Sequence, residues 1–225
     1  MATVNKIKGS VSQSVNNVLL ALVPAFLFKI MQIVCAILFP IDLGLGQFPA
    51  LLSSGMFTAL LILFFFSKFE RLSSIHSGKL FSKNNVKYTL IGAGFVITGI
   101  LLSSSEGSSQ SILTDLQVLW AENVWGKILI FTSLVIYIPL VEELLFRGIL
   151  FRTISKVCDN SWPLAALLSS FIFAFFHFDV SSFLALFSLG MLSSWVFFQT
   201  KSVYCSFAVH ALNNMIVLYI TLLSK

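Results

Sequence analysis

Residues 141–148 (Val-Glu-Glu-Leu-Leu-Phe-Arg-Gly) place two adjacent carboxylates and an arginine inside a run that otherwise suits a lipid-facing helix. A charged side chain at the centre of a membrane-spanning helix costs roughly 2.5–3.5 kcal/mol on insertion scales, so these charges must be paired, hydrated or used. Glu143 and Arg147 are four residues apart and share one helix face, where they can neutralise each other. Glu142 projects about 100° away and has no partner nearby in its own helix. The fold must therefore supply partners for Glu142 from elsewhere in the chain.

The composition of the chain places this stretch in a membrane. Of its 225 residues, 57% are hydrophobic and only 10% are charged. A soluble core does not need so much apolar surface, and the composition is typical of an all-α, polytopic transmembrane helical bundle. The formal net charge of +5 does not indicate nucleic-acid binding, because the positions of the basic residues relative to the spans explain them. Three scattered cysteines argue against a disulfide framework or a zinc module.

We expect about seven spans, within a range of six to eight, in a single integral membrane domain that covers residues 1–225. The apolar segments lie, in chain order, at about 16–39, 50–66, 88–102, 127–156, 162–178, 182–198 and 203–223.

The charges outside these segments predict the orientation of the bundle. Basic residues gather in 68–87, in 152–156 and at Lys201, whereas 103–125 carries only acidic charges. Because basic loops stay on the cytoplasmic side, we expect a cytoplasmic N-terminus, with the first span acting as an uncleaved anchor. Lys29 lies inside that first span and either faces the bundle or a hydrated cavity, or extends its ammonium to the membrane interface.

Polar groups capable of chemistry recur at similar depths in the later spans. At about 1.5 Å per helical residue, Glu142, His177 and His210 lie about 15, 21 and 14 Å from the inner ends of their helices. His210 and Asn214 share one helix face, as do Phe173 and His177, because each pair is four residues apart. We therefore expect acidic, imidazole and amide groups from three helices to meet in one pocket that holds water and opens to the cytoplasm.

A proline precedes the two glutamates. Pro139 has no backbone N–H, so we expect the helix to be irregular at this point and to leave a carbonyl oxygen without its helical partner.

Three ordered motifs on consecutive late helices resemble the signature motifs of the CAAX protease and bacteriocin-processing family, also called the Abi family. They are Glu142-Glu143 with Arg147, Phe173 with His177, and His210 with Asn214. The resemblance covers about residues 140–218, and the catalytic core is expected at about 127–222. The first three spans are not diagnostic.

The resemblance implies an intramembrane endopeptidase that needs no cofactor or metal. Glu142 would be the general base that activates water, His177 would hold or polarise the water, and His210 with Asn214 would stabilise the oxyanion. Glu143, Arg147 and Phe173 would support the site. Donors aimed at a developing oxyanion in a water-poor site are worth about 2.7–4 kcal/mol each.

The resemblance also implies a class of substrate and a location. The substrate would be a membrane-associated peptide or protein, cleaved near the cytoplasmic face of a bacterial plasma membrane. Some members of the family cleave the terminal tripeptide after a prenylated cysteine. Bacterial relatives are linked to peptide or bacteriocin processing and to self-immunity, and this short chain resembles the bacterial kind.

Four alternatives remain open at this stage. Two histidines and a glutamate are also the ligands of a zinc hydrolase, although the chain lacks the two-histidine helical zinc motif and the resemblance favours a metal-free mechanism. The site could instead belong to a non-catalytic membrane scaffold or immunity protein that retains the family residues. The same groups could serve only to hold helices together, or could act in a small transporter or proton relay.

Overall fold

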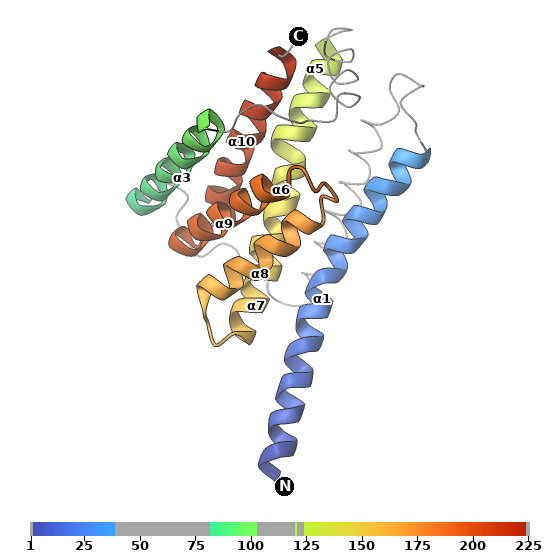
Figure 1. Cartoon of the computed structure of the whole chain (residues 1–225), viewed down its shortest axis with the longest axis vertical. Helices are drawn as coiled ribbons and strands as arrows, with labels where there is room; N and C mark the ends of the chain where they lie inside the picture. The colour runs from blue at the N-terminus through green and yellow to red at the C-terminus, as the bar shows by residue number, and fades with distance from the viewer. Residues whose placement is uncertain (1, 39–81, 103–119, 121–123, 224–225) are drawn as a thin grey trace.

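The computed structural model describes residues 2–38, 82–102, 120 and 124–223 of the chain (Figure 1). Within these ranges the structure contains helices and no strand, which confirms the all-α prediction. The expected second span at about 50–66 lies outside the described residues, as does most of the basic loop at 68–87 and of the acidic segment at 103–125. The helices are α1 (Ala2–Leu38), α3 (Lys83–Leu102), α5 (Val124–Phe131), η3 (Thr132–Tyr137), α6 (Ile138–Glu143), η4 (Leu144–Phe151), α7 (Arg152–Val157), α8 (Trp162–Phe175), α9 (Phe183–Thr200) and α10 (Val203–Leu223).

Four helices of the described chain are long and apolar enough to cross a membrane. They are Ser12–Val34, Gly126–Val157, Phe183–Thr200 and Val203–Leu223. Helix α8 is apolar but has only 14 residues, about 21 Å at the usual helical rise, which is less than the ~30 Å hydrocarbon core. Four of the expected spans therefore coincide with candidate spans, and the total of about seven stays a prediction.

The long helix from Val124 to Val157 carries the two glutamates, and it is not a regular α-helix. It contains two π-helical segments, η3 and η4, and Glu142 and Glu143 lie between them at the end of α6. In η3 the backbone N–H of Ile138 bonds to the carbonyl oxygen of Ser133, five residues earlier. The proline ring at 139 disfavours the regular α-helical turn before it, so a widened turn at this place has a physical cause. The irregularity expected near Pro139 is thus present.

Helices α8 and α9 pack closely because Gly190 has no side chain. A Cβ atom at this position would lie 2.8 Å from the Cβ of Ser170 and 3.1 Å from its Cα. Real Cβ atoms essentially never approach another carbon so closely, so any larger residue would push the two helices apart. The close contact matters for the site because the carbonyl oxygen of Gly190 accepts a hydrogen bond from the long helix.

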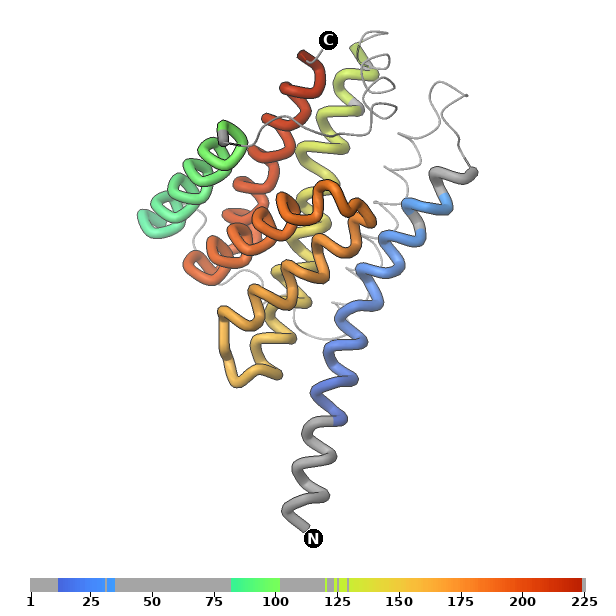
Figure 2. Tube along the Cα trace, viewed as in Figure 1, coloured from blue at the N-terminus to red at the C-terminus, as the bar shows by residue number. Residues whose placement is uncertain are grey.

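Helix α1 runs along one side of the bundle and packs against η4 and α7 (Figure 2). Its buried face includes Ala21, Ala25 and Phe28, which join the same apolar core as Phe146 and Leu150. This packing fixes the rotation of α1 about its own axis. It therefore also fixes the direction in which the next residue, Lys29, points.

Candidate active site

Glu143 and Arg147 form a dry ion pair at the centre of the bundle. Their side chains are 0% and 1% exposed, and Oε1 of Glu143 lies 3.0 Å from Nη1 of Arg147. Nη2 of Arg147 donates to the carbonyl oxygen of Gly190 at 2.9 Å, and the guanidinium lies 4.8 Å from the centre of the Phe173 ring. The pairing expected from the spacing is confirmed, and it ties the long helix to both α8 and α9.

His210 connects this pair to the second glutamate. Its Nδ1 lies 2.9 Å from Oε1 of Glu143, and its Nε2 lies 3.7 Å from Oε2 of Glu142. A carboxylate only accepts hydrogen bonds, so the hydrogen of the ring belongs on Nδ1 and the neutral ring presents the lone pair of Nε2 to Glu142. A separation of 3.7 Å is longer than a hydrogen bond and leaves a gap that a water molecule can bridge.

His177 approaches Glu142 from the other side. Its Nδ1 lies 2.8 Å from the carbonyl oxygen of Phe173 and donates to it, while its Nε2 lies 3.8 Å from Oε1 of Glu142. The fully buried ring of Phe173 contacts both imidazoles edge to face, with centroid distances of 4.7 Å to His177 and 5.7 Å to His210. Each oxygen of Glu142 thus faces the Nε2 of a different histidine, as expected from the three motifs.

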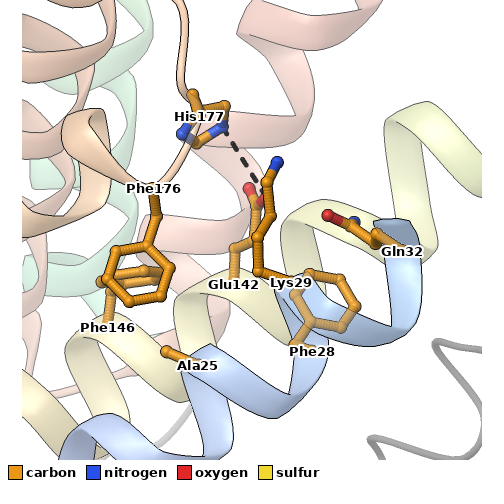
Figure 3. A pocket seen from close by; sticks show the side chains of 8 residues that line it. All are labelled: Ala25, Phe28, Lys29, Gln32, Glu142, Phe146, Phe176 and His177. Atoms are coloured by element: carbon orange, nitrogen blue, oxygen red, sulfur yellow. Dashed lines mark ion pairs between the residues drawn. The ribbon is translucent and has the colours of Figure 1, made fainter. Parts of the chain in front are cut away.

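A small cavity lies beside Glu142 (Figure 3). Its volume is about 20 Å³, which is enough for a single water molecule. The side chain of Glu142 is 10% exposed and that of His177 is 28% exposed, so the histidine lies on the open side. Residues from α1, the long helix and the end of α8 line the cavity: Ala25, Phe28, Lys29, Gln32, Glu142, Phe146, Phe176 and His177.

Two features of the site, one at the cavity and one at the dry ion pair, were not identified from the sequence. The α1 wall was missed because α1 carries none of the three motifs. Lys29 was the one signal that could have indicated it, since a cation inside an apolar span needs an explanation. The structure places it at the cavity, which agrees with the first of the two expectations for this residue. The role of Gly190 as an acceptor for Arg147 left no signal in the sequence.

The side chain of Asn214 bonds to the long helix. Its Nδ2 donates to the carbonyl oxygen of Leu134 in η3 at 2.9 Å, and Asn213 donates to its Oδ1 at 3.3 Å. In a π-helical turn the partner of that carbonyl would be the N–H of residue 139, which is a proline. The asparagine thus supplies the hydrogen bond that Pro139 cannot, so the predicted orphan carbonyl is found together with its replacement donor. The oxyanion role of Asn214 stays a prediction.

The zinc alternative gains no support from the geometry. Across residues 2–38, 82–102, 120 and 124–223, no group of three or more His, Cys, Asp or Glu side chains is arranged to hold a metal ion.

The comparisons with known proteins agree with the motifs. Residues 124–216 match the family model described as type II CAAX prenyl endopeptidase Rce1-like. The matched segment contains every site residue that the sequence singled out on the late helices, and it excludes α1. Searches of the curated proteins and of the solved structures gave no match.

Proposed function

We propose that this chain, whose residues 124–216 match the Rce1-like family model, is an intramembrane endopeptidase that uses Glu142 to activate water. The chain is an integral membrane protein of the CAAX-protease type. The observation that carries the mechanism is the position of Glu142: its two oxygens lie 3.8 and 3.7 Å from the Nε2 atoms of His177 and His210, beside a water-sized cavity.

The first step uses the two groups on the cavity side. A water molecule between Glu142 and His177 donates one proton to the carboxylate and the other, as a hydrogen bond, to Nε2 of the imidazole. The water oxygen then attacks the carbonyl carbon of the peptide bond, and the carbonyl electrons move to its oxygen. When the tetrahedral intermediate collapses, the C–N bond breaks and Glu142 passes its proton to the leaving nitrogen.

The dry pair supports this chemistry through His210. Glu143 fixes the hydrogen of His210 on Nδ1, and Arg147 balances the negative charge of Glu143 in a place that excludes water. His210 and Asn214 are proposed, by resemblance, to stabilise the oxyanion. The hydrogen of His210 and the amide of Asn214 already have partners in the structure, Glu143 and Leu134. His210 would therefore need to exchange its hydrogen bond with Glu143 in order to donate to the substrate, whereas the Asn214 amide has a second N–H.

The resemblance and the charge pattern support the cellular side of the proposal. The substrate is a membrane-associated peptide or protein, and cleavage occurs near the cytoplasmic face of a bacterial plasma membrane, in peptide or bacteriocin processing or in self-immunity. Lys156 in the last turn of the long helix and Lys201 directly after α9 are the kind of basic residues that remain on the cytoplasmic side.

A reconstituted cleavage assay tests the proposal. The purified chain in lipid nanodiscs is mixed with a quenched-fluorescent peptide that ends in a farnesylated cysteine and three further residues, and with the same peptide without the lipid. We expect the wild type to cleave and Glu142→Gln to lose activity by a factor of at least about 100. The matched control is Asp159→Asn, the same carboxylate-to-amide change on the exposed turn after α7, which should leave the rate unchanged.

Two results would contradict the proposal. Equal cleavage by the wild type and Glu142→Gln would remove the glutamate from the mechanism. If neither peptide is cleaved and Glu142→Gln keeps a full immunity phenotype in cells, the chain is instead a non-catalytic scaffold or immunity protein.

A further inference from the structure

One wall of the cavity comes from a helix that the matched segment does not contain. Lys29 and Gln32 of α1 line the cavity, and Glu142 and His177 complete its polar lining (Figure 3). The cavity thus brings an ammonium group to the same space as the carboxylate that the proposed mechanism uses as a base. The three motifs provide no role for this cation.

The packing of the helical turn before Lys29 holds this residue at the cavity. The preceding residue, Phe28, is 5% exposed and belongs to the apolar core, and Phe26 on the same helix meets the ring of Phe176 at 4.8 Å. The ammonium nitrogen of Lys29 lies 5.7 Å from the centre of the Phe178 ring, just beyond His177. The side chain is half-buried and directed along the cavity, so it is not simply extended to the membrane interface.

Lys29 and Glu142 attract each other but do not form a direct ion pair. Within the described part of the chain, the only cationic or ionisable nitrogens within 4.0 Å of the Glu142 oxygens are those of the two histidines. The charge of Glu142 still acts on Lys29 through space. Both side chains line the same water-sized cavity without touching each other, so a group that enters the cavity can meet both of them.

The proposed hydrolysis needs a hydrogen-bond donor at this position. The carbonyl oxygen of the substrate becomes negative in the transition state, and preorganised donors stabilise it most when water is excluded. The ring hydrogen of His210 is donated to Glu143, one N–H of the Asn214 amide is donated to Leu134, and neither residue is among those that line the cavity. Among the described residues that line the cavity, the side chains of Lys29 and Gln32 remain as donors outside these two hydrogen bonds.

We propose that Lys29 is a further catalytic residue, whose ammonium binds the carbonyl oxygen of the scissile peptide bond. This inference rests on the proposed function. Glu142 takes a proton from water, the water oxygen bonds to the carbonyl carbon, and the electron pair that moves to the carbonyl oxygen is stabilised by the ammonium of Lys29. Collapse of the intermediate returns that pair, breaks the C–N bond and sends the proton from Glu142 to the leaving nitrogen. Lys29 keeps its own protons throughout.

The first arm of the test is kinetic and uses the farnesylated peptide. We expect Lys29→Met to lower kcat by about 100-fold with little change in KM, since one oxyanion donor is removed. Lys29→Arg keeps a charged donor and should recover part of the rate. The matched control is Lys127→Met, the same change at an exposed lysine that lies about 20 Å from Glu142 along the long helix. This variant should cleave like the wild type.

The second arm separates this role from an effect of Lys29 on the charge of Glu142. It compares Glu142→Gln with the double variant Glu142→Gln/Lys29→Met, neither of which cleaves. Two ligands are used: the intact peptide, and an analogue in which a phosphinate replaces the scissile amide and carries a negative oxygen. We expect the double variant to bind the phosphinate at least about 10-fold more weakly and the intact peptide equally well.

The outcomes distinguish this inference from the proposed function. If the wild type does not cleave, the proposed function fails and the role of Lys29 fails with it. If the wild type cleaves but Lys29→Met keeps its kcat, or if the two inactive variants bind the phosphinate equally, only the role of Lys29 is overturned. Thermal unfolding of each variant identifies a misfolded protein, and Lys29→Arg then decides the question.

Discussion

Two adjacent glutamates on one helix occupy opposite kinds of environment. Glu143 is fully buried, with Arg147 at 3.0 Å and His210 at 2.9 Å. Glu142 faces a water-sized cavity and has two imidazole nitrogens at 3.7 and 3.8 Å, too far for direct hydrogen bonds. One residue step turns a helix by about 100°, and this rotation is enough to separate a dry ion pair from a carboxylate beside a water-sized cavity.

The difference shows how a membrane protein can carry several charges at little net cost. The dry pair is neutralised and held in one geometry by three helices, so it resists hydration and fixes the imidazole of His210. The partners of Glu142 lie far enough away to admit a water molecule, as the proposed mechanism requires. Variants of the two glutamates and their partners should therefore separate activity from stability.

The largest expected effect is on activity, at the hydrated glutamate. Glu142→Gln should lower the cleavage rate by about 100- to 10,000-fold and leave the unfolding temperature close to that of the wild type, because no short contact is lost. Peptide cleavage and thermal unfolding in nanodiscs measure the two quantities on one sample. A large loss of stability in this variant would mean that Glu142 is structural, like its neighbour.

The next effect is on stability, at the dry pair. Arg147→Met leaves the buried carboxylate of Glu143 without its cation and should cost about 3–5 kcal/mol of unfolding free energy. The double change Glu143→Leu/Arg147→Met should recover most of that loss, although not the activity. Reversible unfolding in mixed micelles provides the comparison, with Lys156→Met as the exposed cation control on α7. If Arg147→Met has the same unfolding free energy as the wild type, the buried carboxylate of Glu143 does not depend on Arg147 for its stability, which would contradict the dry ion pair.

A smaller effect is expected where α10 meets η3. Asn214→Leu leaves the carbonyl oxygen of Leu134 without a donor and should cost about 1–3 kcal/mol. Pro139→Ala restores a backbone N–H that can donate to the Leu134 carbonyl in place of the Asn214 amide. Asn214→Leu should therefore lower the unfolding free energy by less when residue 139 is alanine. A double-mutant cycle on unfolding free energies measures the coupling. Additive effects would show that the amide and the missing N–H are independent.

The smallest effect concerns acid sensitivity at the loop beside the cavity. Hydrogen bonds from the side chains of Ser181 and Ser182 lower the pKa of Asp179 to about 2. Because the folded pKa lies below the usual value, this carboxylate stabilises the loop above about pH 4, and the contribution disappears as the pH falls towards 2. Asp179→Asn should therefore unfold more easily than the wild type at pH 5, and the difference should vanish near pH 2. A constant difference across that range would exclude the carboxylate as its source.

Much of the fold and part of the site could be predicted from local spacing. The pairing of Glu143 with Arg147 follows from a separation of four residues, and the structure confirms it. The convergence of Glu142, His177 and His210 followed from the order and depth of the three motifs, and the structure confirms that as well. The family resemblance is confirmed by the match over residues 124–216.

Other features depended on contacts that no local pattern contains. Asn214 was expected in the pocket, but its amide bonds to a carbonyl that Pro139 leaves free in another helix. The position of Lys29 at the cavity depends on how α1 rotates against η4. The single-domain assignment and the number of spans stay predictions.

The sequence by itself determined that the chain is helical, that its charges must gather away from lipid, and which neighbours on one helix can pair. These outcomes depend on helical geometry and on the cost of placing a charge in hydrocarbon, and both act along a single segment. Only the tertiary structure decided which helix closes the cavity and which donors remain for a substrate. A helix that is apolar on all sides carries little periodic signal to fix its rotation, so packing against its neighbours sets the direction of each polar side chain.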